Sequence, residues 1–212
     1  MGIIQLGILG DLSGKVGPVV GANWNGINTV RARPRRSKKD PTQQQTEQRD
    51  RFSLVVGFAK GFAPLAAMTF IDGVNKKTGF NKVMAHSIKT AITGVWPNFA
   101  LDYSQVLVGR GSLPNAQAPV AAAGAAGVVS WHWTPNSGMG KANANDTSVL
   151  VVFCEALNLG AYITTGALRG TGAGTLNVPG FSGHSVHTWI SFLSLDGKDA
   201  ATSLYTGQVN VV

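Results

Sequence analysis

Six of the nine residues from Arg31 to Lys39 are positively charged, and these side chains are the ones in this chain best suited to binding an anion. The formal net charge of the 212 residues is +8, so most of the excess positive charge lies in this one segment. Guanidinium and ammonium groups at this density bind phosphates or carboxylates, although a solvated linker has the same composition. The predicted contact residues are Arg31, Arg33, Arg35, Arg36, Lys38 and Lys39.

No catalytic or cofactor motif has the spacing that its chemistry requires. Residues 10–16 have three residues between their glycines and a valine after Lys15, whereas a phosphate-binding loop needs four residues and then Ser or Thr. The four histidines lack a cysteine or carboxylate cluster that would complete a metal site, and no serine stands in a nucleophile elbow. We therefore expect no enzyme, no cofactor, no metal site and no small-molecule substrate. The residues considered are His86, His132, His184, His187, Ser182, Ser185 and Ser191.

The composition predicts a folded protein with an unusually neutral surface. Charged residues make up 13% of the chain, which contains 27 glycines, and such surfaces suit packing against copies of themselves. Cys154 is the single cysteine and lies in an apolar run, which predicts a buried thiol. No run reaches the roughly 18 apolar residues of a membrane span, and the start has no cationic signal-peptide region. We expect cytoplasmic synthesis without a signal peptide, with virions or extracellular assemblies as locations after release.

The basic residues must be positioned by a β-hairpin in an amino-terminal segment, residues 1–40. Asn25-Gly26 is a strong signal for a two-residue turn, and pairing outward from it sets Trp24 opposite Ile27, with Val20 opposite Arg31. Arg31 and Arg33 then share one face with Trp24 and Ile27. The apolar start has two open roles: docking on a neighbour's sheet edge or closing the protein's own small sheet. Its residues are Ile3, Ile4, Leu6, Ile8 and Leu9.

The residue pattern in the remainder of the chain predicts two further segments and, for the whole chain, an α+β, mainly β protein. Residues 41–102 carry apolar residues at helical spacing, with Asp40 as N-cap, a first helix that Pro64 stops and a second over residues 81–93. Residues 103–212 carry seven short β-type runs separated by turn residues, which predict an antiparallel sandwich of immunoglobulin or fibronectin type III type. The expected strands are 103–109, 127–133, 148–154, 162–168, 174–178, 187–193 and 203–211. The expected sandwich core includes Trp131, Val151, Phe153, Ile190 and Phe192, although the apolar run 149–153 also allows burial on both faces.

The chain carries characteristic motifs at residues 14–21 with Trp24, 31–34, 49–52, 97–104, 129–131 and 194–198. Together these motifs resemble a family of uncharacterised proteins from Bacteroidota that occur in chromosomes and apparent mobile elements. The resemblance spans nearly the whole chain and implies no known activity and no functional residues. Asp40-Pro41 departs from it, because the family pattern has Asn-Pro there. The amino-terminal hairpin and basic segment also resemble those of some phage structural proteins.

Two functions from different classes follow from these observations. The first is a structural, self-assembling homo-oligomer, a phage-derived virion or filament component that packs through its sandwich and amino-terminal strand. The second is a nucleic-acid-binding module that uses the basic segment 31–39 on phosphates. That segment contains no aromatic residue to stack on bases. The arrangement of Arg31 and Arg33 beside Trp24 and Ile27 favours a protein contact between subunits.

Overall fold

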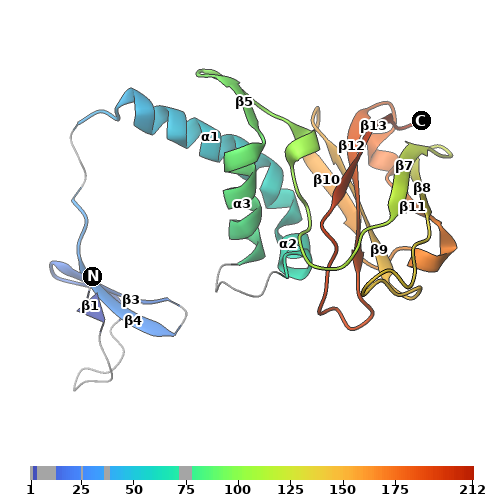
Figure 1. Cartoon of the computed structure of the whole chain (residues 1–212). Helices are drawn as coiled ribbons and strands as arrows, with labels where there is room; N and C mark the ends of the chain where they lie inside the picture. Colours follow the sequence, from blue (N-terminus) through green and yellow to red (C-terminus); the bar gives the residue numbers. More distant parts are fainter. Residues whose placement is uncertain (1, 4–12, 25, 36–38, 72–77) are drawn as a thin grey trace. The chain divides into compact units, whose positions relative to one another are not determined.

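The computed structural model describes residues 2–3, 13–24, 26–35, 39–71 and 78–212, and these form a mainly β protein (Figure 1). The chain divides into two compact units, Met1–Thr42 and Gln43–Val212. The expected helical segment 41–102 and the expected sandwich 103–212 thus lie almost entirely within one unit. They share a hydrophobic core, which is described below.

The first unit is a four-stranded antiparallel sheet in the order β1-β4-β3-β2. The predicted hairpin register is confirmed, with Trp24 opposite Ile27 and Val20 opposite Arg31. Gly26 at the turn has a φ of +78°, which the two-residue turn requires. The sequence pattern predicts that the first hairpin strand starts at Val16, but it starts at Val19, because a turn at Gly17-Pro18 puts Gly14–Val16 into a separate strand. The strands are β1 (Gly2–Ile3), β2 (Gly14–Val16), β3 (Val19–Trp24) and β4 (Ile27–Ala32).

The first helical stretch differs from the prediction at its start and at its expected end. It begins at Gln43 rather than Pro41, so Asp40 is not its N-cap as predicted. Pro64 does not end it, since the proline lies in the first turn of a second helix, where its missing N–H costs nothing. The elements are α1 (Gln43–Ala59), η1 (Lys60–Phe62) and α2 (Ala63–Thr69).

The predicted second helix exists as α3 (Gly79–Thr90), which the Thr78 side chain caps by accepting from the amide of Asn81. It ends three residues earlier than expected. Strands β5 (Ile92–Val95) and β6 (Asn98–Leu101) pair as a short hairpin instead, because β-branched residues and Gly94, at a φ of +85°, favour strand and turn over helix.

The helical stretch Gln43–Thr69 is long and apolar enough to cross a membrane by length and composition, contrary to the sequence expectation. The core helix of a folded domain passes the same test. Here Val55, Phe58, Phe62 and Leu65 are buried inside the protein, at 0–2% exposure. The apolar composition of this stretch is therefore used in packing against the adjacent sheet.

Residues beyond 116 form the predicted antiparallel sandwich of two sheets, β11-β8-β7 and β10-β9-β12-β13. The fourth strand of the sandwich, β10, pairs with the third in the second sheet, which is the fibronectin type III arrangement rather than that of an immunoglobulin constant domain. Short 3-10 turns, η2 (Tyr103–Gln105), η3 (Arg169–Thr171) and η4 (Pro179–Phe181), lie between strands. The strands are β7 (Gln117–Ala123), β8 (Val128–Thr134), β9 (Thr147–Cys154), β10 (Leu159–Ile163), β11 (Ala173–Asn177), β12 (Ser185–Leu193) and β13 (Leu204–Asn210).

One predicted strand is wrong, one is shifted and one real strand is missing from the prediction. The shifted strand was expected at residues 162–168 but is β10, which ends at Ile163. Residues 103–109 contain η2 followed by an irregular extended segment rather than a strand. The first strand of the sandwich is β7, which pairs with β8. Alanines and Pro119 dominate β7, and both residue types are depleted in strands, so its sequence gives little strand signal.

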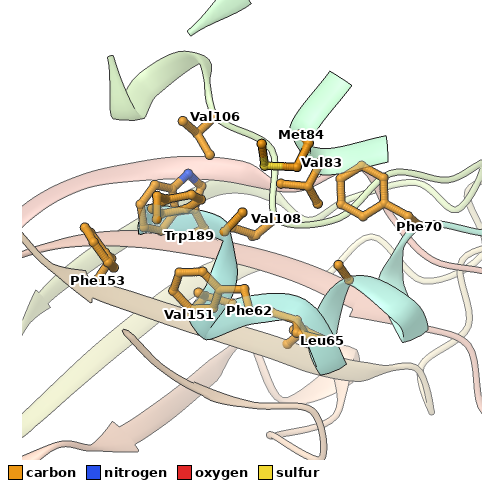
Figure 2. Close-up of a cluster of buried hydrophobic side chains, with 14 of the residues drawn as sticks. Phe62, Leu65, Phe70, Val83, Met84, Val106, Val108, Val151, Phe153 and Trp189 are labelled. Atoms are coloured by element: carbon orange, nitrogen blue, oxygen red, sulfur yellow. The ribbon is translucent and has the colours of Figure 1, made fainter. Parts of the chain in front are cut away.

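The sheet β10-β9-β12-β13 is covered on both faces, as the continuous apolar run of β9 allows. Trp131, Ile190 and Phe192 are fully buried between the two sheets, as predicted. Val151 and Phe153 are also buried, but on the opposite face, where they meet residues of the helices and Trp189 (Figure 2). Assigning all five to one sandwich core is wrong, because side chains at odd and even positions of β9 leave the sheet on opposite sides.

Candidate functional site

The amino-terminal sheet brings together part of the predicted basic segment. Arg31 lies in β4, and Arg33 and Arg35 lie just beyond the end of that strand. These three arginines and Lys15 line one hollow of about 950 Å³, with Pro18 and Val20 also in its lining. Lys39 is described and is exposed, outside this lining. Arg36 and Lys38 lie outside the described residues.

Strand register explains why these cations share a face. Lys15 of β2 pairs with Val20 of β3, which pairs in turn with Arg31 of β4, so the three residues form one row across the sheet. Residues opposite one another in a sheet project to the same side. The amide of Arg33 donates to the carbonyl oxygen of Pro18 at 2.7 Å, which holds the chain beyond β4 against the neighbouring turn. Lys15 was not among the predicted contact residues, because the prediction was confined to the basic segment 31–39.

The cations on this face have no acidic partner within the described part of the chain. Lys15, Arg31, Arg33 and Arg35 are all exposed, and the ion pairs described lie in the second unit. Lys15 of β2 and Arg31 of β4, which flank β3, add their like charges to those of Arg33 and Arg35 and give a local positive potential. The face can therefore attract carboxylates or phosphates from another molecule.

The described side chains of the sheet that carries these cations form almost no core. Among residues 13–23, 26–35 and 39–42, Gly21 alone is buried. Val16 and Ile27 keep 56% and 39% of their surface exposed. A small sheet gains stability only when a face is covered by another layer.

The predicted docking residues are only partly within the described structure. Ile3 lies in β1 opposite Thr29, and Gly2 lies opposite Val30, so these two residues extend the chain's own sheet next to β4. That placement corresponds to the second of the two roles left open for the apolar start. Ile4, Leu6, Ile8 and Leu9 lie outside the described residues.

A second cluster, which the sequence did not predict, lies on the helix-facing side of the second sheet. The rings of Tyr103 and His187 stack with centroids 3.9 Å apart, and His187 Nδ1 lies 2.9 Å from the Tyr205 hydroxyl. His187 Nε2 is 3.9 Å from a carboxylate oxygen of Glu155. We call Asp102, Tyr103, Glu155, His187 and Tyr205 the acidic-aromatic cluster. Its members come from four separate segments, so no local sequence signal could have located it.

Burial and the two carboxylates set the charge of the acidic-aromatic cluster. Burial raises the pKa of Tyr103, and the charge of Glu155 raises it further. Burial also raises the pKa of Tyr205, with Asp102 as the second cause. Burial lowers the pKa of His187 below 6.5, an effect that Glu155 opposes. At neutral pH the tyrosines and the histidine are therefore uncharged, and the carboxylates give the cluster a negative charge.

The remaining sequence candidates form no site in the described residues. Gly14–Val16 is a strand followed by another strand, whereas a phosphate-binding loop leads into a helix. Searched over the described residues, His, Cys, Asp and Glu form no group of three or more that could hold a metal. The Ser182 and Ser191 hydroxyls donate to backbone carbonyl oxygens. Cys154 is buried as a free thiol, as predicted.

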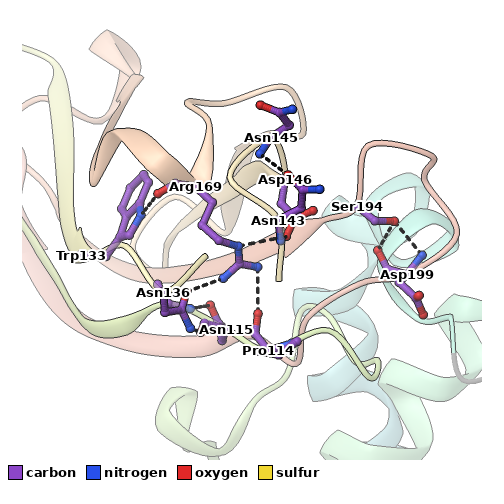
Figure 3. Close-up of polar contacts among 11 residues, drawn as sticks. Pro114, Asn115, Trp133, Asn136, Asn143, Asn145, Asp146, Arg169, Ser194 and Asp199 are labelled. Carbon is purple, nitrogen blue, oxygen red and sulfur yellow. Dashed lines mark hydrogen bonds and ion pairs between the residues drawn. The ribbon is translucent and has the colours of Figure 1, made fainter. Parts of the chain in front are cut away.

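A buried ion pair at one end of the sandwich is structural. Arg169 is 0% exposed; its Nε donates to Asp146 at 3.0 Å, Nη1 to the Asn136 side chain at 2.8 Å and Nη2 to the Pro114 carbonyl oxygen at 2.8 Å (Figure 3). The guanidinium also lies 4.1 Å from the centroid of the Phe192 ring. Each of the three guanidinium nitrogens donates a hydrogen bond inside the protein, so this buried group joins the loops around it.

Comparison with known proteins yields a family but no activity. A family model described as "Family of unknown function (DUF6266)" matches residues 11–207, which is most of the chain. No curated protein matches this chain. A similar solved structure is the fibronectin type III domain of the human collagen alpha-1(XX) chain, at 14% sequence identity. The match covers 49% of this chain and 91% of that domain, with a TM-score of 0.34.

Proposed function

We propose that this chain, which belongs to the family of unknown function DUF6266, is a non-enzymatic structural protein that assembles with copies of itself. The observation that carries the proposal is the exposed amino-terminal sheet. In its described residues, one glycine is buried and apolar side chains remain in water. Such a sheet is completed by another molecule, and in a self-assembling protein that molecule is a second copy.

Free energy favours covering this sheet. Burying an exposed aliphatic side chain stabilises a protein by about 1.5–3 kcal/mol, and Val16 and Ile27 are available for burial. A sheet of this size has too little buried area to offset its conformational entropy without a covering layer. Docking on a neighbour supplies that layer and links the two copies.

The second unit is suited to act as the body of such an assembly. It has two hydrophobic cores, one within the sandwich and one between the sandwich and the helices. These cores make it a rigid unit that does not depend on the amino-terminal sheet. The low proportion of charged residues, 13% of the chain, leaves few like-charge barriers between copies.

We further propose that the assembly is a phage-derived virion or filament component. The support is the resemblance of the amino-terminal hairpin and basic segment to phage structural proteins, and of the chain to Bacteroidota proteins in apparent mobile elements. On this proposal the protein is made in the cytoplasm and found in virions or extracellular assemblies after release.

Sedimentation velocity of the full chain and of a fragment of residues 43–212 tests the proposal. The fragment contains both hydrophobic cores and is expected to fold by itself. We expect the full chain to sediment as an oligomer at micromolar concentration and the fragment as a monomer. Monomeric sedimentation of both proteins would refute self-assembly.

Nucleic-acid binding is the second candidate function, and the observation that favours it is the hollow lined by Lys15, Arg31, Arg33 and Arg35. Phosphate contacts release counterions, so the logarithm of the affinity for duplex DNA should fall with the logarithm of salt concentration, with a slope of about −0.9 per contact. Changing Arg31, Arg33 and Arg35 to Gln should then abolish DNA binding. Unchanged assembly of this variant, together with lost DNA binding, would favour this second function.

A further inference from the structure

We propose that the basic face of the amino-terminal sheet docks on the acidic-aromatic cluster of a second copy of this chain. The proposal rests on the proposed self-assembly and names the two surfaces that meet. One surface is this basic face, which is formed by Lys15, Arg31, Arg33 and Arg35. The other is formed by Asp102, Tyr103, Glu155, His187 and Tyr205.

In the described part of the chain no Lys or Arg is paired with the carboxylates of the cluster, unlike two other acidic groups of the second unit. Asp146 is paired with Arg169, and Asp199 with Lys141. Glu155 instead has His187 as its described neighbour, and burial keeps that imidazole uncharged by lowering its pKa. The side chain of Glu155 is 70% exposed, so its charge faces water and is free to meet a cation.

The chemistry of the cluster matches an arginine better than another ligand. A guanidinium binds carboxylates through paired N–H groups and stacks on aromatic rings with its flat face. The cluster offers both, since Glu155 and Asp102 lie around the rings of Tyr103 and Tyr205. The protein itself uses such stacking twice in its described residues, with Arg51 over Phe99 at 4.7 Å and Arg169 over Phe192 at 4.1 Å.

The surface beside the cluster has room for a projecting side chain. The β9–β10 turn carries Glu155 and Asn158, and the amide of Asn158 donates to the Glu155 carbonyl oxygen. Asn158 also lines a hollow of about 410 Å³, whose other walls include Asp50 of α1 and Phe99 of β6. Asp50 thus adds a third carboxylate next to the turn that carries Glu155, whereas the Phe99 ring already has Arg51 stacked on it.

The charges of the two units make a second copy a suitable occupant. Residues 1–42 contain seven Lys and Arg against two Asp, so two amino-terminal sheets repel one another. Each copy carries both the basic face and the acidic-aromatic cluster. A contact between unlike surfaces leaves one of each free on the pair, so it propagates to further copies.

A charge-exchange experiment on the full chain tests this contact. One variant carries Arg31→Glu and Arg33→Glu, and the other carries Glu155→Lys, whose site is exposed enough to tolerate the change. Like charges across an interface oppose association, so each variant alone should associate roughly tenfold more weakly than wild type in sedimentation. An equimolar mixture should assemble again, because the intact sheet of one variant meets the intact cluster of the other.

Two control variants separate this contact from a general effect of charge on association. Asp196→Lys makes a comparable charge reversal at an exposed loop away from the cluster and should assemble as wild type does. Glu155→Gln removes the charge without reversing it and should weaken association less than Glu155→Lys. Thermal unfolding of each variant establishes that it is folded.

The outcomes distinguish this proposal from self-assembly itself. Normal assembly of both charge-reversed variants would overturn the sheet-to-cluster contact while leaving self-assembly in place. Two weakened variants that do not recover on mixing would also overturn it, since a contact between copies must be restored in the mixture. A monomeric wild type would instead refute the proposed function.

Discussion

Arg169 and Trp131 illustrate how single side chains hold the sandwich together. Both are fully buried, and both have their polar groups satisfied by hydrogen bonds within the protein. The Trp131 indole donates to the Thr206 hydroxyl at 3.1 Å. Thr206 lies where the pairing of β12 with β13 shifts register, so the irregularity of β13 supplies the acceptor that a buried indole needs.

Replacing Asp146 by Ala should strongly destabilise the protein. Removing one partner of a buried ion pair leaves an uncompensated charge, at a cost of about 3–5 kcal/mol. Chemical denaturation of the 43–212 fragment measures the loss. Lys141→Ala is the matched control, because its pair with Asp199 is exposed and screened by water. A wild-type unfolding midpoint for Asp146→Ala would contradict the structural role of the pair.

Trp131→Ala should cost about 3–5 kcal/mol through the cavity it creates between the sheets. Trp96→Ala is the control, since that side chain lies in the turn of the β5–β6 hairpin and is 38% exposed. Thermal unfolding of the two variants should show a large shift for the first and a small one for the second. Equal shifts would contradict the assignment of Trp131 to the core.

The stability of the protein should fall as the pH decreases below about 6.5. Burial lowers the pKa of both His187 and His86 in the folded state, so the unfolded chain binds protons more readily. The stabilisation is complete above the unfolded pKa and is lost as the pH falls from there through the lower folded pKa. His187→Gln should reduce this loss between about pH 7 and 5, as measured by urea unfolding. An unchanged pH dependence in the variant would show that His187 makes no contribution.

At the scale of elements, features set by local sequence patterns were predicted better than features set by contacts between distant segments. The register of the amino-terminal hairpin follows from Asn25-Gly26, and the sandwich follows from alternating residues and turn signals. Strand β7 was missed because alanine and proline give no strand pattern. The row through Lys15 and the acidic-aromatic cluster depend on pairings between separate segments, which periodicity does not encode. The basic face was therefore predicted in part and its proposed acidic counterpart not at all.

Substitution of Gly160 tests the contact between the helices and strand β10, and substitution of Gly57 serves as its control. A Cβ atom on Gly160 would overlap the buried Phe62 ring, so Gly160→Ala should destabilise by about 1–3 kcal/mol through overpacking. A Cβ atom on Gly57 of α1 would meet nothing within 4 Å, so Gly57→Ala should stabilise by about 0.5–1 kcal/mol. Urea unfolding measures both, and opposite signs are expected. A stabilising Gly160→Ala would mean that η1 and β10 are not in close contact.

At the scale of the whole molecule, stability and assembly are assigned to different units. The second unit contains both hydrophobic cores, whereas the described part of the first presents exposed apolar side chains and a row of exposed cations. Because the two roles are separate, the second unit can fold before the amino-terminal sheet binds a second copy. On our account, the protein joins copies of itself through its surfaces. Its described residues offer few groups that are suited to catalysis.

Hydrogen exchange of the β3 and β4 amides as a function of protein concentration tests this account most directly. A sheet completed by a second copy should exchange slowly at assembling concentrations and much faster after dilution to the monomer, while amides of β9 and β12 stay protected throughout. That result would link order in the amino-terminal sheet to contact between copies. Equal protection of β3 and β4 in the monomer and at high concentration would contradict the account, because the sheet would then be stable by itself.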